Sequence, residues 1–290
     1  MRYVSHFILN EMAWNLAANL LYTFAHPIPM MPENCFRLDG LIGDLFPQEY
    51  VGHIIFMSIL LAALNCVIAL MLCFQFRYMS LSHKNRIRHI RPLWGYLYCA
   101  GIQVSVSCLF VFYYLNWLVP LSDYPNQSVI TSRMFCFHSS GFRKGFALFS
   151  FFGSTLLALL FMVLFNLLCL RRLHQQEGLL DARTVRLQKK LLRNLMILAA
   201  VPTLIGFLPI LVAVVLVYRN DLTYSREIST TCIIIALNHG TVYGIVTIML
   251  FKAYRAPIRQ IFMKVRSKIL FQKNNQLASN VIVWTAANEI

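Results

Sequence analysis

Residues 51–76 read VGHIIFMSILLAALNCVIALMLCFQF, an apolar run that contains no Asp, Glu, Lys or Arg. At a rise of about 1.5 Å per residue, a helix of this length crosses a hydrocarbon core of about 30 Å. Similar runs recur along the 290-residue chain, of which 58% is hydrophobic and only 13% charged. Because a water-soluble core cannot bury so much apolar surface, the sequence predicts an integral membrane protein.

Six apolar runs predict an all-α bundle of six membrane-spanning helices, at residues 4–24, 51–76, 93–118, 146–170, 191–218 and 228–251. We expect residues 1–255 to form a single transmembrane helical domain and residues 256–290 to form a basic cytoplasmic tail. Residues 256–270 of the tail place apolar and basic side chains at helical spacing. This spacing predicts a short amphipathic helix on the inner leaflet, with a solvated basic tail as the alternative.

The basic residues set the predicted orientation, because Lys and Arg of short loops stay on the cytoplasmic side. Most of the 26 basic residues fall in residues 77–91, 171–193 and 252–273, whereas most acidic residues fall in the segments that alternate with these. The net charge of +15 is therefore explained by topology, and we expect no nucleic-acid partner. A glycosylation sequon begins at Asn126, in a segment assigned to the outside.

Cysteine usage indicates a disulfide rather than a metal site. Cys35 and Cys136 are the two cysteines in the predicted outer loops, where the environment is oxidising. We predict that they pair and tie the two loops together, with two unpaired thiols as the alternative. The chain has no CxxC pair, no metal-ligand spacing of Cys and His, and no catalytic motif, so we expect no metal, no cofactor and no enzymatic activity.

Polar side chains inside the predicted spans are the candidates for binding a ligand, because burying them in lipid is costly and they should face the bundle interior. The candidates are Glu11, Asn15, His53, Gln103, Asn238 and His239. For each of them, an interhelical hydrogen bond is the structural alternative. Pro202 and Pro209 remove backbone donors on one face of the fifth span, which predicts a hinge or, alternatively, a static kink.

Four short patterns occur in an order that resembles the nematode serpentine chemoreceptors of the Str superfamily, particularly classes D, H and I. The patterns are His26-Pro27-Ile28-Pro29 with Pro32, Cys35 and Gly40; Phe76-Arg77-Tyr78; Gln188-Lys189-Lys190-Leu191-Leu192 leading to Val201-Pro202 and Leu208-Pro209; and Asn238-His239-Gly240 followed by Tyr254-Arg255. The resemblance covers nearly the whole chain. It implies a seven-helix G-protein-coupled receptor that takes part in olfaction.

The resemblance implies a small chemical ligand, a heterotrimeric G protein and the bilayer as partners, in the plasma membrane of sensory cells. Arg77, Tyr78 and Arg255 would then face the G protein. The residues before Arg77 are Gln75 and Phe76, so the acidic residue common in such receptors is absent. With six spans Met1 lies inside, so we expect the receptor's first helix to be missing. A small polytopic transporter or channel and a nonfunctional receptor remnant are the alternatives.

Overall fold

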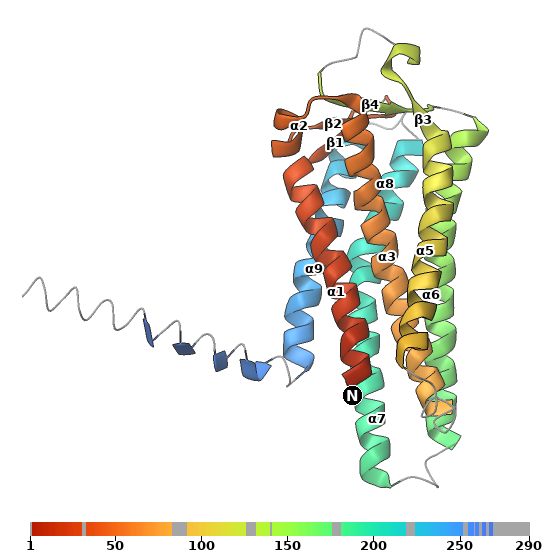
Figure 1. The fold of residues 1–290 in the computed structure, drawn as a ribbon, viewed down its shortest axis with the longest axis vertical. Helices are drawn as coiled ribbons and strands as arrows, with labels where there is room; N and C mark the ends of the chain where they lie inside the picture. The colour runs from red at the N-terminus through yellow and green to blue at the C-terminus, as the bar shows by residue number, and fades with distance from the viewer. Residues whose placement is uncertain are drawn as a thin grey trace, which may run out of the picture. The chain divides into compact units, whose positions relative to one another are not determined.

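The computed structural model describes residues 2–30, 33–82, 92–125, 132–139, 141–175, 181–218 and 224–251, together with 255–257, 259–260, 263–264 and 267–268. The chain divides into two compact units, residues 1–243 and residues 244–290. The first unit holds the helix bundle shown in Figure 1. Within the predicted amphipathic helix at 256–270, residues 256–257, 259–260, 263–264 and 267–268 are described and helical, whereas the sequon at Asn126 lies outside the described residues. The predicted domain boundary after residue 255 stays a prediction.

The predicted helical membrane bundle is confirmed. Its long helices are α1 (Arg2–Ala25), α3 (Glu49–Ser82), α5 (Pro92–Trp117), α6 (Phe142–Gln175), α7 (Ala182–Val201), α8 (Leu208–Tyr218) and α9 (Ser225–Leu250). Within the described residues, five helical stretches are long and apolar enough to cross a membrane, and α7 and α8 together supply one of them. The helix α1 is long enough, but it is not among the five because Glu11 and three asparagines lower its hydropathy.

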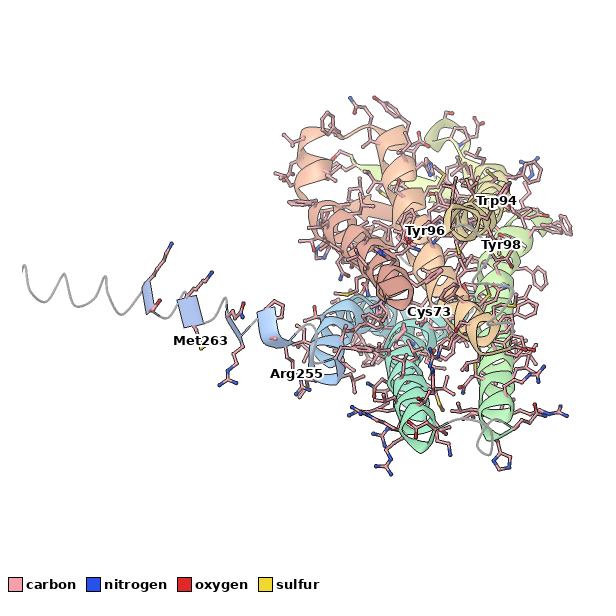
Figure 2. All side chains as sticks on the ribbon, turned by 60° about the horizontal axis from the view of Figure 1, so that its bottom comes forward. Cys73, Trp94, Tyr96, Tyr98, Arg255 and Met263 are labelled. Atoms are coloured by element: carbon pink, nitrogen blue, oxygen red, sulfur yellow. A yellow bond between two sulfur atoms is a disulfide. The ribbon has the colours of Figure 1, made fainter. Side chains whose placement is uncertain are left out.

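The helix α3 is the packing centre of the first unit. It packs against α1 on one side and α6 on the other, and its buried side chains include Leu64, Leu72 and Phe74. The helix α5 by contrast buries few of its side chains completely, and these lie near its C-terminal end, at Phe110, Tyr114 and Trp117. Figure 2 shows Trp94, Tyr96 and Tyr98 at the start of α5, all of them exposed. Aromatic side chains at one end of an exposed apolar helix are typical of a bilayer interface.

A four-stranded antiparallel sheet, which the sequence did not predict, lies at one end of the helices (Figure 1). The strands follow the spatial order β1 (Pro27–Met30), β2 (Cys35–Leu38), β4 (Met134–Phe137) and β3 (Leu118–Val119). Cys35 and Cys136 are register partners across β2 and β4, and their predicted disulfide is present. The sheet therefore joins the two segments that were predicted to lie outside, with a disulfide between its strands, and we call it the outer sheet.

Polar contacts fix the outer sheet to the helices. Arg133 pairs with Asp44 in α2 (Leu41–Leu45). The buried ammonium group of Lys144, at the start of α6, donates to Asn34 Oδ1 and to the Ser139 carbonyl, each at 3.2 Å. These contacts attach the sheet to α2 and α6, so the sheet covers this end of the helix bundle.

The fifth predicted span is broken in the middle by a π-helical turn, η3 (Pro202–Phe207), between α7 and α8. The backbone N–H of Leu208 bonds to the Thr203 carbonyl, a separation of five residues in place of the usual four. Pro202 has no N–H, and the Thr203 hydroxyl donates to the Ala199 carbonyl at 2.8 Å. The proline pair thus coincides with a local irregularity, whereas its role as a moving hinge stays a prediction.

Candidate functional site

A cavity of about 190 Å³ lies inside the first unit, beneath the outer sheet. Its wall is contributed by α1, α3, α5, α6, α8, α9 and the sheet, so segments far apart in the sequence meet around one space. The lining side chains are predominantly apolar. Nine of the lining positions are Phe, Tyr or Trp: Tyr22, Phe36, Phe56, Phe110, Tyr114, Trp117, Phe137, Phe151 and Phe152. We call this space the inner cavity.

The roof of the inner cavity is a cluster of aromatic rings carried by the outer sheet and the helices below it. Phe36 of β2 contacts Phe56 of α3, with ring centroids 4.5 Å apart. Phe137 of β4 stacks on Trp117 of α5 at 4.2 Å. Contacts of this kind are worth roughly 0.5–1.5 kcal/mol beyond area burial. They join the sheet to the bundle and leave an aromatic surface facing the cavity.

One histidine provides a polar group in the cavity wall. His239 of α9 bonds through Nδ1 to the Ala236 carbonyl of its own helix. Since a carbonyl only accepts, Nδ1 carries the proton and Nε2 is the acceptor. Tyr114 also lines the cavity, but its hydroxyl already donates to the His53 carbonyl at 3.0 Å. The other polar lining residues are Asn19, Tyr22, Glu33 and Asn34, and of these Asn19, Glu33 and Asn34 bond within the protein. The cavity therefore suits a largely apolar molecule that donates a hydrogen bond to His239.

His239 also contacts the π-helical turn. A β-carbon added at Gly206 of η3 would lie 3.3 Å from His239 Cγ, closer than ordinary van der Waals contact. A side chain at this position would require the His239 ring to move by a few tenths of an ångström. His239 is therefore in contact with the cavity on one side and with the irregular segment between α7 and α8 on the other.

Of the six predicted ligand-binding residues, His239 alone lines the inner cavity. Glu11 and Asn15 are buried elsewhere, between α1, α3 and α9. Cys66 Sγ donates to Glu11 Oε1 at 3.2 Å, and the Tyr243 hydroxyl bonds to the same carboxyl group. Both residues face the bundle interior as expected, with Asn15 accepting from Asn19 Nδ2 of its own helix at 3.4 Å, and their role in binding a ligand stays a prediction.

The other three candidates also lie away from the inner cavity. His53 packs edge-on against Phe135 and Phe137 of β4, with ring centroids 5.1 and 5.3 Å apart, and so contacts the outer sheet. Gln103 is half-buried on α5, and its Nε2 has no hydrogen-bond partner within the described part of the chain. Asn238 is exposed and donates to the Ile234 carbonyl at 2.9 Å. Because the Asn238 amide donates to a carbonyl of its own helix, it can lie on an exposed face. The prediction that Asn238 faces the bundle interior was therefore wrong.

The residues predicted to face a G protein lie in different settings. Arg77 is only 7% exposed, and its Nε and Nη2 have no hydrogen-bond partner among the described residues. Tyr78 is half-buried, with its ring 6.1 Å from that of Phe165 on α6. Arg255 is exposed and belongs to the second unit. The structure therefore places Arg77 inside the bundle rather than on its surface.

Sequence reasoning missed the aromatic residues of the outer sheet, including Phe36 and Phe137. The sequence feature that could have indicated a buried strand is the apolar segment Met134–Phe137, which reads MFCF and is buried throughout. An apolar segment of four residues is too short to be told from a loop by periodicity. No group of three His, Cys, Asp or Glu residues suited to a metal ion occurs in the described ranges.

A family model described as "Serpentine type 7TM GPCR chemoreceptor Srh" matches residues 1–264. This match covers the whole first unit and extends past α9. No curated protein matches the sequence.

Proposed function

Because the chain belongs to the Srh family of serpentine seven-transmembrane G-protein-coupled chemoreceptors, we propose that it is a chemosensory receptor that binds a small, neutral, apolar molecule in the inner cavity. The aromatic lining of that cavity is the observation that carries the ligand class. An anionic ligand would lose its hydration there and meet only the Glu33 carboxylate, which already accepts from the Tyr124 hydroxyl. The cavity is also smaller than the roughly 300–1,000 Å³ of drug-sized sites, which favours a compact ligand.

The contact between His239 and Gly206 supports a route from the ligand to the cytoplasmic side. A ligand that rests on His239 changes the space available to the π-helical turn. Because η3 joins α7 to α8, a change in its geometry alters the angle between them. Ligand binding then shifts the population between two arrangements of α7, as in other ligand-driven equilibria.

The proposed partner on the cytoplasmic side is a heterotrimeric G protein. The basic residues of segment 171–193 lie at the end of α6 and along α7, which this motion would displace. We infer that Arg77 acts inside the bundle when the two arrangements interconvert. Its buried Nε and Nη2 have no hydrogen-bond partner among the described residues, so they can donate to a carboxylate or carbonyl that comes within reach in the second arrangement. The contributions of Tyr78 and Arg255 stay predictions.

Two matched substitutions test the binding site in cells that report G-protein signalling and are exposed to a panel of small neutral apolar compounds. Ala147→Leu adds bulk to a buried residue of the cavity wall, whereas Ala100→Leu adds the same bulk to an exposed position of α5. We expect a compound that activates the wild type to lose its effect on Ala147→Leu and to keep it on Ala100→Leu. Equal responses of the two variants, at equal surface expression, would rule out the inner cavity as the site.

Other assignments follow from the resemblance and stay proposals. These are placement in the Str superfamily, the plasma membrane of sensory cells, a role in olfaction, cytoplasmic basic loops and C-terminus, and glycosylation at Asn126. The expected absence of a first helix also stays a prediction.

A further inference from the structure

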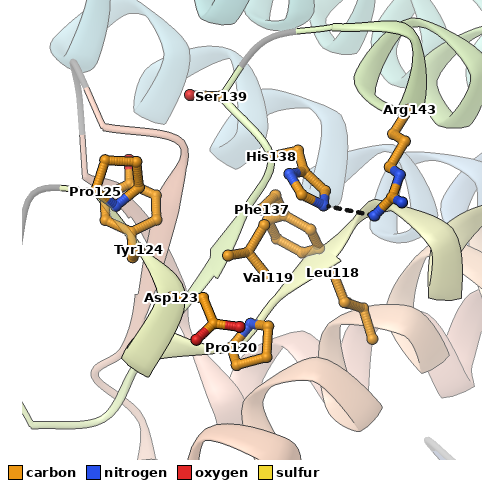
Figure 3. A pocket seen from close by; sticks show the side chains of 10 residues that line it. All are labelled: Leu118, Val119, Pro120, Asp123, Tyr124, Pro125, Phe137, His138, Ser139 and Arg143. Atoms are coloured by element: carbon orange, nitrogen blue, oxygen red, sulfur yellow. Dashed lines mark hydrogen bonds between the residues drawn. The ribbon is translucent and has the colours of Figure 1, made fainter.

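A second pocket, of about 260 Å³, lies at the outer end of the bundle, between the segment that follows β3 and the one that joins β4 to α6. Its lining is shown in Figure 3 and includes Leu118, Val119, Asp123, Phe137, His138 and Arg143. Phe137 also lines the inner cavity, so its ring separates the two spaces. We call this second space the outer pocket.

One side of the outer pocket is cationic. Arg143, the second residue of α6, is exposed, and its Nη1 donates to His138 Nε2 at 3.2 Å. Partial burial and the Arg143 charge lower the pKa of His138, so at neutral pH its Nε2 is an acceptor. A guanidinium has five N–H donors in a planar fork that matches a carboxylate. The bond to His138 uses one of them and orients the group over the pocket, as Figure 3 shows.

The rest of the wall limits what can bind beside Arg143. Leu118, Val119 and Phe137 are apolar and suit a compact hydrocarbon body. Asp123 lies on the opposite side of the pocket from Arg143 in Figure 3. Its carboxylate disfavours a second negative charge on the occupant.

We propose that the outer pocket binds a small monocarboxylate, with its carboxylate on Arg143 and its apolar body against Leu118, Val119 and Phe137. The site is separate from the inner cavity and takes the opposite class of molecule, charged rather than neutral. It does not depend on signalling, so it stands or falls independently of the receptor function.

The probe for this test is 4-fluorobenzoate, whose fluorine signal is followed by NMR with the full chain in nanodiscs of neutral lipid. The uncharged isostere 4-fluorobenzamide and empty nanodiscs are the controls for binding to lipid and to apolar surface. We expect the amide to bind at least about fivefold more weakly, because it lacks the charge-assisted hydrogen bonds to Arg143. No binding above empty nanodiscs, or equal affinity for acid and amide, overturns the proposal.

Three substitutions locate the site. Arg143→Gln should weaken 4-fluorobenzoate binding about fivefold. Asp123→Asn should strengthen it about twofold, because a repulsive charge is removed. Arg226→Gln changes an exposed basic residue of α9 outside the pocket and should have no effect. Unchanged binding by Arg143→Gln overturns the proposal; if that variant fails to fold, weaker or unchanged binding by Asp123→Asn overturns it instead.

Discussion

Gly240 of α9 lies against the Asn15 side chain of α1 so closely that a β-carbon at position 240 would overlap the Asn15 amide oxygen and Asn19 Nδ2. Small residues that allow close helix approach are a common means of packing helices in a membrane, where the hydrophobic effect does not drive helices together. The same region holds the buried Glu11 with its partners Cys66 and Tyr243. Close packing and polar contacts thus occur together at the junction of α1, α3 and α9.

Gly240→Ala should destabilise the bundle by about 1–3 kcal/mol, because the new methyl group must displace the Asn15 and Asn19 amides and disturb the hydrogen bond between them. Thermal unfolding in detergent measures the effect. Gly101→Ala is the control, since a β-carbon there would meet no described atom within 4 Å. A control that lost as much stability as Gly240→Ala would contradict this explanation.

Glu11→Leu should cost about 1–3 kcal/mol, since Cys66 and Tyr243 would lose an acceptor in a site from which water is excluded. Glu11→Gln keeps an acceptor oxygen of the same shape and should cost less. The two variants are compared by thermal unfolding under identical conditions. The idea of a structural hydrogen-bond cluster fails if the leucine variant is the more stable of the two.

Cys35→Ser should lower stability by ~4 kcal/mol, because the disulfide closes a loop with a sequence separation of 101 residues and restricts the unfolded chain. Reducing agent should bring the wild type to the level of the variant and leave the variant unchanged. Cys108→Ser, at an exposed free cysteine of α5, should leave stability unchanged. A wild type insensitive to full reduction would be the contrary result.

Tyr124 gives a specific pH dependence. Burial, followed by the neighbouring Glu33 that its hydroxyl contacts at 2.7 Å, raises the pKa of this phenol from 10.0 to about 12. The folded protein thus holds the proton more tightly than the unfolded chain, so this contribution is complete below pH 10 and lost between pH 10 and about 12. Ultraviolet titration of the wild type minus Tyr124→Phe should show one phenolate forming near pH 12. A difference curve centred near pH 10 would contradict the contact.

Gly206→Ala tests the route from the inner cavity to α7. The added methyl group would press on His239, so we expect altered basal signalling or ligand potency at unchanged surface expression. The control is Gly153→Ala on α6, where a β-carbon would be in ordinary contact with Phe149, at 3.7 Å. Signalling that responds to neither substitution would remove the support for this route.

The sequence predicted those features that follow from the hydropathy and charge of single segments. The disulfide could be predicted because topology alone placed Cys35 and Cys136 on the same side of the membrane. The strand Pro27–Met30 could not, since its two prolines suggest a loop and its pairing with β2 depends on where the chain returns. The inner cavity could not be predicted from the sequence either, because its wall combines residues from six helices and the sheet.

The sequence by itself determined that the chain is a bundle of apolar helices long enough to cross a membrane, because hydropathy and helix length are properties of a single segment. The tertiary structure alone decided which polar residues face the cavity. Asn238 and His239 are neighbours, and consecutive residues of an α-helix point about 100° apart. His239 lines the inner cavity while Asn238 is exposed, so the outcome depended on the rotation of α9 against its neighbours, which no single segment encodes.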